Sequence, residues 1–237
     1  MVQLSIVLPC YNPPDDWEQH VSEAYAYITR HLNIAPELII VNDGSNKNID
    51  TGLELLKTKI PGLAYITLPK NKGKGAALRA GVAKATGTLV IYTDIDFPYT
   101  LDSFLAVFNA LNTGNYDIVI GIKNADYYRY SPRYRTFISK MLRKGIGFFF
   151  NMPVTDTQCG LKGFNQQGKA VFLETTIDRY LFDLEFVYQS FKKYRNLKVK
   201  SIAVSLRPNV IFRAMNLKVL ASESSNFLKI LLKRSNK

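Results

Sequence analysis

The chain has 237 residues, of which 47% are hydrophobic and 21% are charged, a balance typical of a folded globular protein with a sizeable core. Its two cysteines, Cys10 and Cys159, provide neither a disulfide framework nor a zinc-binding spacing, so we expect a reducing, intracellular setting. The formal net charge of +12 indicates an anionic partner, such as a phosphate compound, nucleic acid or an anionic membrane.

The sequence contains no apolar stretch close to the ~18 residues that a membrane-spanning helix needs, and its start does not resemble a signal peptide. We therefore expect a soluble or peripheral protein. The positive charge is clustered between Lys123 and Lys144 and again from Leu217 to Lys237, where cations are mixed with apolar residues. Basic amphipathic segments of this kind occur in membrane interfaces, although a core-packed helix with a basic outer side has the same pattern.

Strand and helix patterns alternate through the first half of the chain. In chain order, the hydrophobic periodicity predicts strands at 4–12, 37–45, 63–71, 88–94 and 116–123, separated by helices at 15–32, 48–60, 75–85 and 100–114. This alternation predicts an α/β fold with a mostly parallel sheet and helices on both faces. The topology after Lys123 stays open. We expect one domain over residues 1–212 and a basic amphipathic helical tail over 213–237.

Four of the predicted strands end in polar or glycine-containing turns. In open α/β sheets, ligands bind beyond the carboxyl ends of the strands, and right-handed crossovers bring these ends to one edge. We therefore expect Asn12, Asp43, the glycine-rich turn near Lys72, and the pair Asp94 and Asp96 to line one cleft.

The most informative turn is "TDID", which places Asp94 and Asp96 at the end of a buried strand. Alternate residues of an extended backbone point to the same side, so both carboxylates can face one cation. Two neighbouring carboxylates repel each other unless a positive charge neutralises them. Oxygen ligands of this kind suit Mg²⁺ or Mn²⁺, which complete their coordination with substrate phosphates. An acidic turn that caps a helix is the alternative interpretation.

Three other motifs each have a chemical and a structural interpretation. Asp43 in "VNDGS" can bind a nucleoside or shape an Asp-Gly turn. Gly73 and Gly75 in "NKGKGAALRAG" can expose amides to a phosphate or allow close helix packing, and neither standard nucleotide-binding glycine fingerprint matches. Asp183 and Glu185 in "RYLFDLEF" can act in chemistry or stabilise the start of a helix.

The ordered set "SIVLPCYN", "VNDGS", "NKGKGAALRAG", "YTDID", "DTQCGLKGF" and "FDLEF" resembles family 2 inverting glycosyltransferases of the GT-A fold. The last two motifs are most similar to the polyprenyl-phosphate sugar transferases, the dolichyl-phosphate glucosyl- and mannosyltransferase group. The resemblance covers Val2 to Glu185. It implies a nucleotide-sugar donor of the UDP-glucose or GDP-mannose type, Mg²⁺ or Mn²⁺, and transfer of a hexose to a polyprenyl phosphate with inversion.

The resemblance also implies roles for individual residues. The residues expected to contact the donor are Pro9, Tyr11, Asn12, Asp43, Lys72, Lys74, Asp94 and Lys123. The metal ligands are expected to be Asp94 and Asp96, and the groups facing the acceptor phosphate Arg135 and Ser139. Asp156 and Gln158 are expected beside the transferred sugar, and Asp183 near the reaction centre. This chain departs from the family pattern at Lys123, where relatives often carry arginine, and at Ile95, where many carry a small residue.

The nature of the acceptor decides the chemistry that the protein must supply. A phosphate acceptor is already ionised near neutral pH and needs positioning, whereas a hydroxyl acceptor needs a base, for which Asp156 and Asp183 are the candidates. A family 2 glycosyltransferase that acts on a sugar hydroxyl of a glycan or lipid-linked oligosaccharide is therefore the main alternative. A nucleic-acid-binding module would explain the charge but not the acid pair, so we expect no nucleic-acid partner. We expect a cytoplasmic protein bound peripherally to the membrane, and the oligomeric state stays open.

Overall fold

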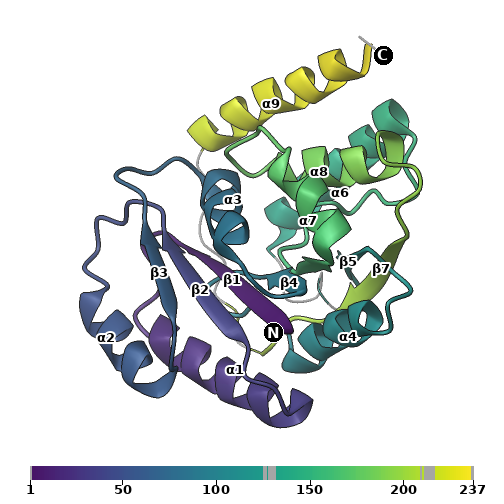
Figure 1. Cartoon of the computed structure of the whole chain (residues 1–237). Helices are drawn as coiled ribbons and strands as arrows, with labels where there is room; N and C mark the ends of the chain where they lie inside the picture. The colour runs from purple at the N-terminus through teal and green to yellow at the C-terminus, as the bar shows by residue number, and fades with distance from the viewer. Residues whose placement is uncertain (1, 125–126, 128–131, 209, 211–216, 236–237) are drawn as a thin grey trace.

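A seven-stranded sheet organises the chain, for which the computed structural model describes residues 2–124, 127, 132–208, 210 and 217–235. The strands are β1 (Leu4–Cys10), β2 (Glu37–Asn42), β3 (Ala64–Thr67), β4 (Leu89–Tyr92), β5 (Ile118–Lys123), β6 (Lys162–Phe164) and β7 (Val199–Val204). The helices are α1 (Trp17–Leu32), α2 (Asp50–Lys59), α3 (Lys74–Lys84), α4 (Leu101–Asn112), α6 (Arg133–Phe150), α7 (Gln166–Leu173), α8 (Phe182–Lys192) and α9 (Leu217–Ser235). The arrangement is shown in Figure 1.

The sheet is mostly parallel, as the sequence predicts. Its strand order is β3-β2-β1-β4-β6-β5-β7, and every neighbouring pair is parallel except the two that β6 makes with β4 and β5. The carboxyl ends of the other six strands therefore share one edge of the sheet, where polar side chains of the connecting loops can meet. The antiparallel β6 falls in the region after Lys123 that the hydrophobic pattern leaves open.

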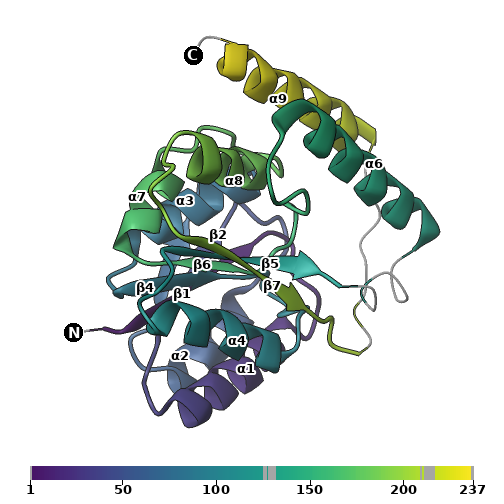
Figure 2. The same ribbon diagram turned by 90° about the vertical axis from the view of Figure 1, so that its right-hand side faces the viewer.

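Both faces of the central strands are buried, which explains their uninterrupted apolar sequences. Alternate residues of β1 enter two different hydrophobic clusters: Leu4, Ile6 and Leu8 belong to one, and Val7 belongs to the other. Figure 2 shows α1, α2 and α4 against one face of the sheet and α3, α7 and α8 against the opposite face. The helical covers on both sides confirm the predicted layers.

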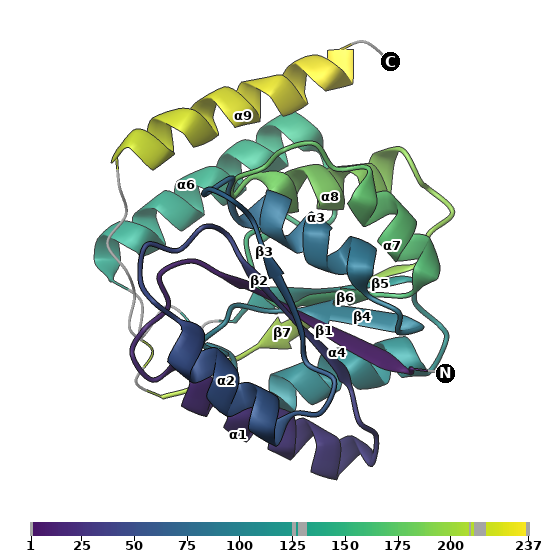
Figure 3. The same ribbon diagram turned by 60° about the vertical axis from the view of Figure 1, so that its left-hand side comes forward.

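Helices α6 and α9 form a pair outside the α3, α7 and α8 layer. Figures 2 and 3 show α9 lying along α6, and its Phe227 ring contacts the rings of Phe149 and Phe150 at centroid distances of 5.9 and 5.4 Å. Ile146 and Ile230 are buried in the same region. The C-terminal segment is therefore packed as a helix from Leu217, whereas a domain boundary at 212/213 stays a prediction, because 213–216 lie outside the described residues.

Within the part of the chain that the structure describes, none of the helices is both long enough and apolar enough to cross a membrane.

The small residues of α3 allow it to approach the sheet closely. A Cβ atom at Gly81 would lie 2.4 Å from Val7 Cγ1 and 2.9 Å from Val41 Cγ2. The helix axis is thus held nearer to β1 and β2 than a larger residue at this position would permit. For this glycine, close helix–sheet packing is the interpretation that the structure supports.

We predict that Gly81→Ala lowers the free energy of unfolding by about 1–3 kcal/mol, because the added methyl group overpacks the contact with the sheet. Gly145→Ala is the matched control within α6, since its Cβ would meet Phe227 Cζ at an ordinary 3.8 Å. There the better helix propensity of alanine should raise stability by roughly 0.5–1 kcal/mol. Urea unfolding of the two variants measures both effects, and equal stabilities would contradict the packing argument.

Candidate active site

The acidic pair follows β4 in a tight turn rather than in extended backbone. β4 ends at Tyr92, and the backbone N–H of Phe97 donates to the carbonyl oxygen of Asp94 at 3.0 Å. Phe97 has a φ of 44°, in the left-handed region that few non-glycine residues adopt. The expectation that Asp94 and Asp96 share one side of a strand is therefore wrong in its geometry, because the strand stops two residues earlier.

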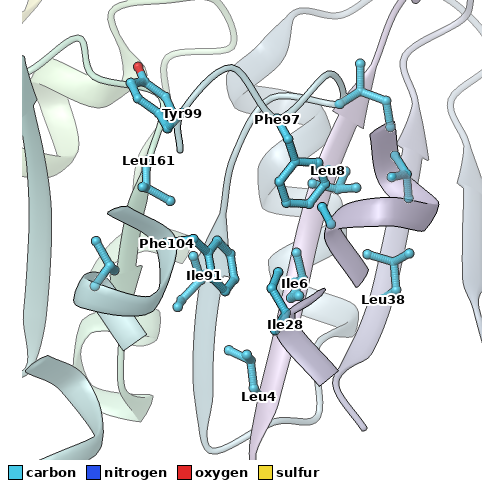
Figure 4. Packing of buried hydrophobic residues seen from close by; sticks show 14 of the residues in the cluster. Leu4, Ile6, Leu8, Ile28, Leu38, Ile91, Phe97, Tyr99, Phe104 and Leu161 are labelled. Carbon is cyan, nitrogen blue, oxygen red and sulfur yellow. The ribbon is translucent and has the colours of Figure 1, made fainter. Parts of the chain in front are cut away.

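Apolar side chains hold this turn in place. Ile95, Phe97 and Tyr99 are 5–7% exposed and enter the hydrophobic cluster between the sheet and α1 and α4. Figure 4 shows the Phe97 ring beside Leu8 and the Tyr99 ring near Leu161. Alternate side chains of the turn thus anchor it in the core, while Asp94 and Asp96 remain partly exposed. This packing gives the bulky Ile95 a structural role.

Two distant segments converge on Asp94. The Lys74 ammonium, at the first residue of α3, lies 2.5 Å from Asp94 Oδ1. Gly160 contacts the other carboxylate oxygen so closely that a Cβ there would lie 2.5 Å from Asp94 Oδ2. Burial works against the charge of Lys74, but the carboxylates of Asp94 and Asp183 raise its pKa above the usual lysine range. Lys74 is therefore a cation at neutral pH and neutralises Asp94.

The second acid of the pair is harder to ionise. Burial of its carboxyl group and, next, the negative charge of Asp94 raise the pKa of Asp96. Arg207, which follows β7, donates from Nη2 to the Asp96 carbonyl at 3.2 Å and from Nε to the Phe97 carbonyl at 3.1 Å. Lys74 from α3 and Arg207 from the segment after β7 thus hold the turn, and their charges only partly offset the burial and the repulsion that raise the pKa of Asp96.

Residues 155–160, which contain the "DTQCG" motif, form a loop that packs on the acidic turn. The Gly160 backbone N–H donates to the Tyr99 hydroxyl at 2.9 Å. Asp156 is buried and accepts from the backbone N–H of Lys123 at 2.6 Å, and the Lys123 ammonium lies 3.5 Å from its other oxygen. Gln158 is partly buried. The structure therefore brings Asp156 and Lys123 together as an ion pair at the end of β5.

Asp43 and Asn12 shape the loops that follow β2 and β1. The two carboxylate oxygens of Asp43 accept from the backbone N–H groups of Lys72 and Gly73 at 2.7 and 2.8 Å. The Asn12 amide oxygen accepts from the backbone N–H groups of Asn46 and Lys47 at 2.9 and 3.1 Å. Each carboxylate oxygen keeps a further lone pair, so contact of Asp43 with a nucleoside stays a prediction alongside its turn-forming role.

Pro9 and Tyr11 precede this region at the end of β1. Pro9 is half-buried and the Tyr11 ring is 40% exposed, so a planar ligand has access to it. Lys72 is exposed next to the glycine-rich turn. Contact of these three residues with a nucleotide stays a prediction.

Asp183 and Glu185 lie in the first turn of α8, but neither caps it, because the N-cap residue is Leu181. The buried Glu185 accepts from the backbone N–H groups of Thr176 and Ile177 at 2.7 and 2.8 Å, and so holds the preceding loop. Asp183 is buried and accepts on one oxygen from the Tyr92 hydroxyl and from the Lys162 ammonium, both at 2.6 Å. Two strong donors therefore already engage this carboxylate.

Arg135 and Ser139 lie one turn apart on α6 and are both partly buried. Burial raises the pKa of the Tyr127 hydroxyl, whereas the nearby cations of Lys123 and Arg135 lower it. Arg135 therefore lies on the same side of the molecule as the Lys123–Asp156 ion pair. A contact of Ser139 with this region stays a prediction.

Arg207 and Lys162 were missed by the sequence reasoning. The strand-end argument could have found Arg207 if β7 had been recognised, because Arg207 follows this strand (Val199–Val204) by three positions. Lys162 is part of "DTQCGLKGF", but a lysine between apolar residues gives no sign that its ammonium is fully buried.

The acid pair fits a divalent cation that takes a small number of protein ligands. Among the residues that the structure describes, no group of three or more His, Cys, Asp or Glu side chains could hold a metal. Two carboxylates from Asp94 and Asp96 suit Mg²⁺ or Mn²⁺, which take one or two carboxylates and the rest of their ligands from phosphates and water. The residues present therefore fit a metal that binds together with a phosphate-containing ligand.

Comparison with solved structures confirms the expected GT-A fold. The structure is similar to glucosyl-3-phosphoglycerate synthase from Mycobacterium tuberculosis in complex with Mn²⁺, uridine diphosphate and phosphoglyceric acid. The TM-score is 0.72 with 16% sequence identity, over 98% of this chain and 78% of that one. The same protein in complex with phosphoglyceric acid gives a TM-score of 0.74.

Comparison with curated sequences finds dolichyl-phosphate beta-glucosyltransferases. One from Trichomonas vaginalis is 29% identical in an alignment of 219 residues that covers 86% of this chain and 63% of that protein. The human protein of this name is 27% identical over 219 residues, with 86% of this chain and 67% of that protein covered. This chain therefore spans a little under two thirds of the length of the Trichomonas relative. The model of glycosyl transferase family 2 matches residues 5–169, and the chain belongs to that family.

Proposed function

We propose that this protein transfers glucose from a nucleotide sugar to a polyprenyl phosphate, with inversion at the anomeric carbon. The observation that carries the proposal is the convergence on Asp94 of the Lys74 end of α3 and the loop 155–160, at the carboxyl edge of a GT-A sheet. The relatives named dolichyl-phosphate beta-glucosyltransferase support both the sugar and the class of acceptor.

Asp94 and Asp96 hold the divalent cation in this proposal. A bound Mg²⁺ or Mn²⁺ supplies positive charge that stabilises the leaving diphosphate. With a cation at Asp94, Lys74 would be available to bind a donor phosphate together with the exposed Lys72. The complex of the structurally similar synthase with Mn²⁺ and uridine diphosphate supports a divalent cation and a nucleotide as ligands.

The two candidate bases favour a phosphate acceptor over a hydroxyl acceptor. Asp156 is buried and engaged by Lys123, and Asp183 is buried and engaged by Lys162 and Tyr92. Burial and these protein partners limit the access of a substrate hydroxyl to either carboxylate. A phosphate monoester is already ionised near neutral pH and needs cations that position it. Lys123, Arg135 and Ser139 are the proposed positioning groups.

The test is a panel of nucleotide sugars with polyprenyl phosphate, in the presence of Mg²⁺ or Mn²⁺ and in the presence of a chelator. We expect a glucosylated lipid phosphate from UDP-glucose and loss of this product in chelator. Full activity in chelator would remove the metal from the proposal. Product from a sugar-hydroxyl acceptor, with none from polyprenyl phosphate, would establish the alternative glycosyltransferase function.

We predict that Asp94→Asn reduces transfer at least 100-fold, because the amide cannot neutralise or hold the cation that stabilises the leaving group; removing one preorganised electrostatic group typically costs about 10²–10³ in rate. Asp50→Asn makes the same chemical change at an exposed residue of α2 and should leave the rate unchanged. Initial rates across a Mn²⁺ titration measure the effect. Wild-type rates for Asp94→Asn at all metal concentrations would contradict the assignment.

We also predict that Lys74→Gln increases the affinity of the donor-free protein for Mn²⁺, because the ammonium competes with the metal for Asp94. For a partly exposed ion pair worth roughly 1 kcal/mol, the increase is about three- to tenfold. Electron paramagnetic resonance of free Mn²⁺ measures the affinity. Lys72→Gln is the matched control, two residues away and exposed, and equal affinities of the two variants would refute the competition.

Peripheral contact with an anionic membrane is the second part of the proposal. Helix α6 carries exposed apolar side chains at positions 134, 137, 141 and 148, whose spacing places them along one side of the helix. Exposed basic residues flank this stripe, namely Arg133, Lys140 and Lys144. An amphipathic helix with this combination can lie in a membrane interface, where each cation contributes about 1 kcal/mol near anionic lipid. Such contact would bring a lipid-linked acceptor to the site.

We predict that the double substitution Phe137→Ser and Met141→Ser reduces binding to anionic vesicles at least tenfold, because it removes apolar side chains that are 64% and 58% exposed on α6. Leu55→Ser on α2, a helix of the opposite layer, is the matched control for loss of an exposed apolar residue. Vesicle co-sedimentation compares the two. Unchanged binding of the double variant would exclude α6 as the contact.

A further inference from the structure

A fully buried ion pair connects three of the segments that build the site. The side chain of Lys162 is 0% exposed and that of Asp183 6% exposed, with 2.6 Å between the ammonium nitrogen and Asp183 Oδ1. The same ammonium donates to the carbonyl oxygen of Cys159 at 2.5 Å. The Tyr92 hydroxyl donates to the same oxygen of Asp183 at 2.6 Å, and the ammonium lies 5.7 Å from the Tyr92 ring centroid.

Fold stability alone does not explain this pair. Taking an ammonium and a carboxylate out of water is costly, and replacing a buried pair by apolar residues is often neutral or stabilising. The surroundings are otherwise aromatic, since the rings of Phe164, Phe172 and Phe182 pack around Tyr92. An apolar residue at position 162 would suit such a core. What the ammonium adds is a fixed geometry for the groups that it touches.

Two residues near the Lys162 ammonium, Tyr92 and Cys159, are close in sequence to groups that form or contact the acidic turn. Tyr92 is the last residue of β4 and stands two positions before Asp94. Cys159 precedes Gly160, which contacts Asp94 Oδ2 and donates its N–H to Tyr99. The Lys162 ammonium therefore links the loop 155–160, through Asp183, to Tyr92 at the end of β4. Tyr99, in the segment after the acids, binds the same loop through the Gly160 N–H.

We propose that Lys162 is a positioning residue: by holding the Cys159 carbonyl and Asp183, it clamps loop 155–160 against Asp94 in the geometry that the donor requires. The inference deepens the proposed function, since it rests on a nucleotide-sugar donor at Asp94. It assigns no proton transfer to Lys162, and it makes Asp183 the anchor of the clamp as well as its charge partner.

The test compares wild type with the double variant Lys162→Met and Asp183→Asn. The double variant removes the clamp without leaving a buried charge uncompensated, whereas either single substitution would leave one. We expect UDP-glucose affinity in Mn²⁺, measured by calorimetry, to fall at least tenfold in the double variant.

Hydrogen exchange provides the readout that is independent of the donor. Amides of residues 155–160 should exchange at least tenfold faster in the double variant than in wild type, with the amides of β1 and β2 unchanged. Asp117→Asn is the control for a purely structural loss, because Asp117 accepts from Asn165 Nδ2 and the Lys198 N–H, both at 2.8 Å, at the other end of the strands. It should lower the melting temperature while keeping the donor affinity and the loop exchange of wild type.

The outcomes separate the two proposals. If wild type does not bind UDP-glucose, the proposed donor is wrong, and loop exchange alone decides the role of Lys162. If wild type binds and the double variant keeps wild-type affinity or wild-type exchange in 155–160, the positioning role is overturned.

Discussion

Repulsion between two carboxylates at the end of one buried strand is the constraint on which the site depends. Asp94 and Asp96 stand two residues apart after β4, and burial together with Asp94 raises the pKa of Asp96. The Lys74 ammonium lies 2.5 Å from Asp94, and Arg207 donates to the backbone carbonyl of Asp96 in the turn. Within the described residues, the charges of Lys74 and Arg207 only partly offset this repulsion, since the pKa of Asp96 stays raised. A divalent ion bound with a diphosphate would add the positive charge that two neighbouring carboxylates favour.

The acids can be held so close because neighbouring residues fix the turn and leave room for it. Ile95, Phe97 and Tyr99 enter the core on one side. Gly160 presses on the other side, where the absence of a side chain brings its backbone to the carboxylate. Any larger residue at 160 would displace Asp94 or the loop 155–160. The site therefore depends on apolar packing and a glycine as much as on the charged groups themselves.

Local patterns in the sequence predicted much of the fold but little of the pairing within the site. Apolar periodicity places the strands and helices up to Lys123 close to their observed bounds, and the strand-end rule brings Asn12, Asp43 and Asp94 to one edge. Neither reveals that β6 is antiparallel, because three residues, Lys162–Phe164, carry too little pattern. Nor do they pair Lys162 with Asp183, or Lys123 with Asp156: such pairs depend on contacts between distant segments. The turn at Asp94 is not evident from the sequence, because the alternation of acidic and apolar residues from Asp94 to Phe97 has the period of an extended strand although β4 ends at Tyr92.

Helix α6 has one side that faces the candidate site and one side that is exposed and apolar. Its partly buried side carries Arg135 and Ser139 on the side of the Lys123–Asp156 ion pair, and its outer side exposes Phe137 and Met141. Because a helix presents residues two positions apart on nearly opposite sides, a short segment can face an anionic head group inward and an apolar surface outward. A lipid phosphate has this same division between a charged end and an apolar chain. A soluble phosphate ester would use the cations of Lys123 and Arg135 but would leave the exposed apolar stripe of α6 without a role. The two sides of α6 together therefore favour an acceptor that is part of a membrane.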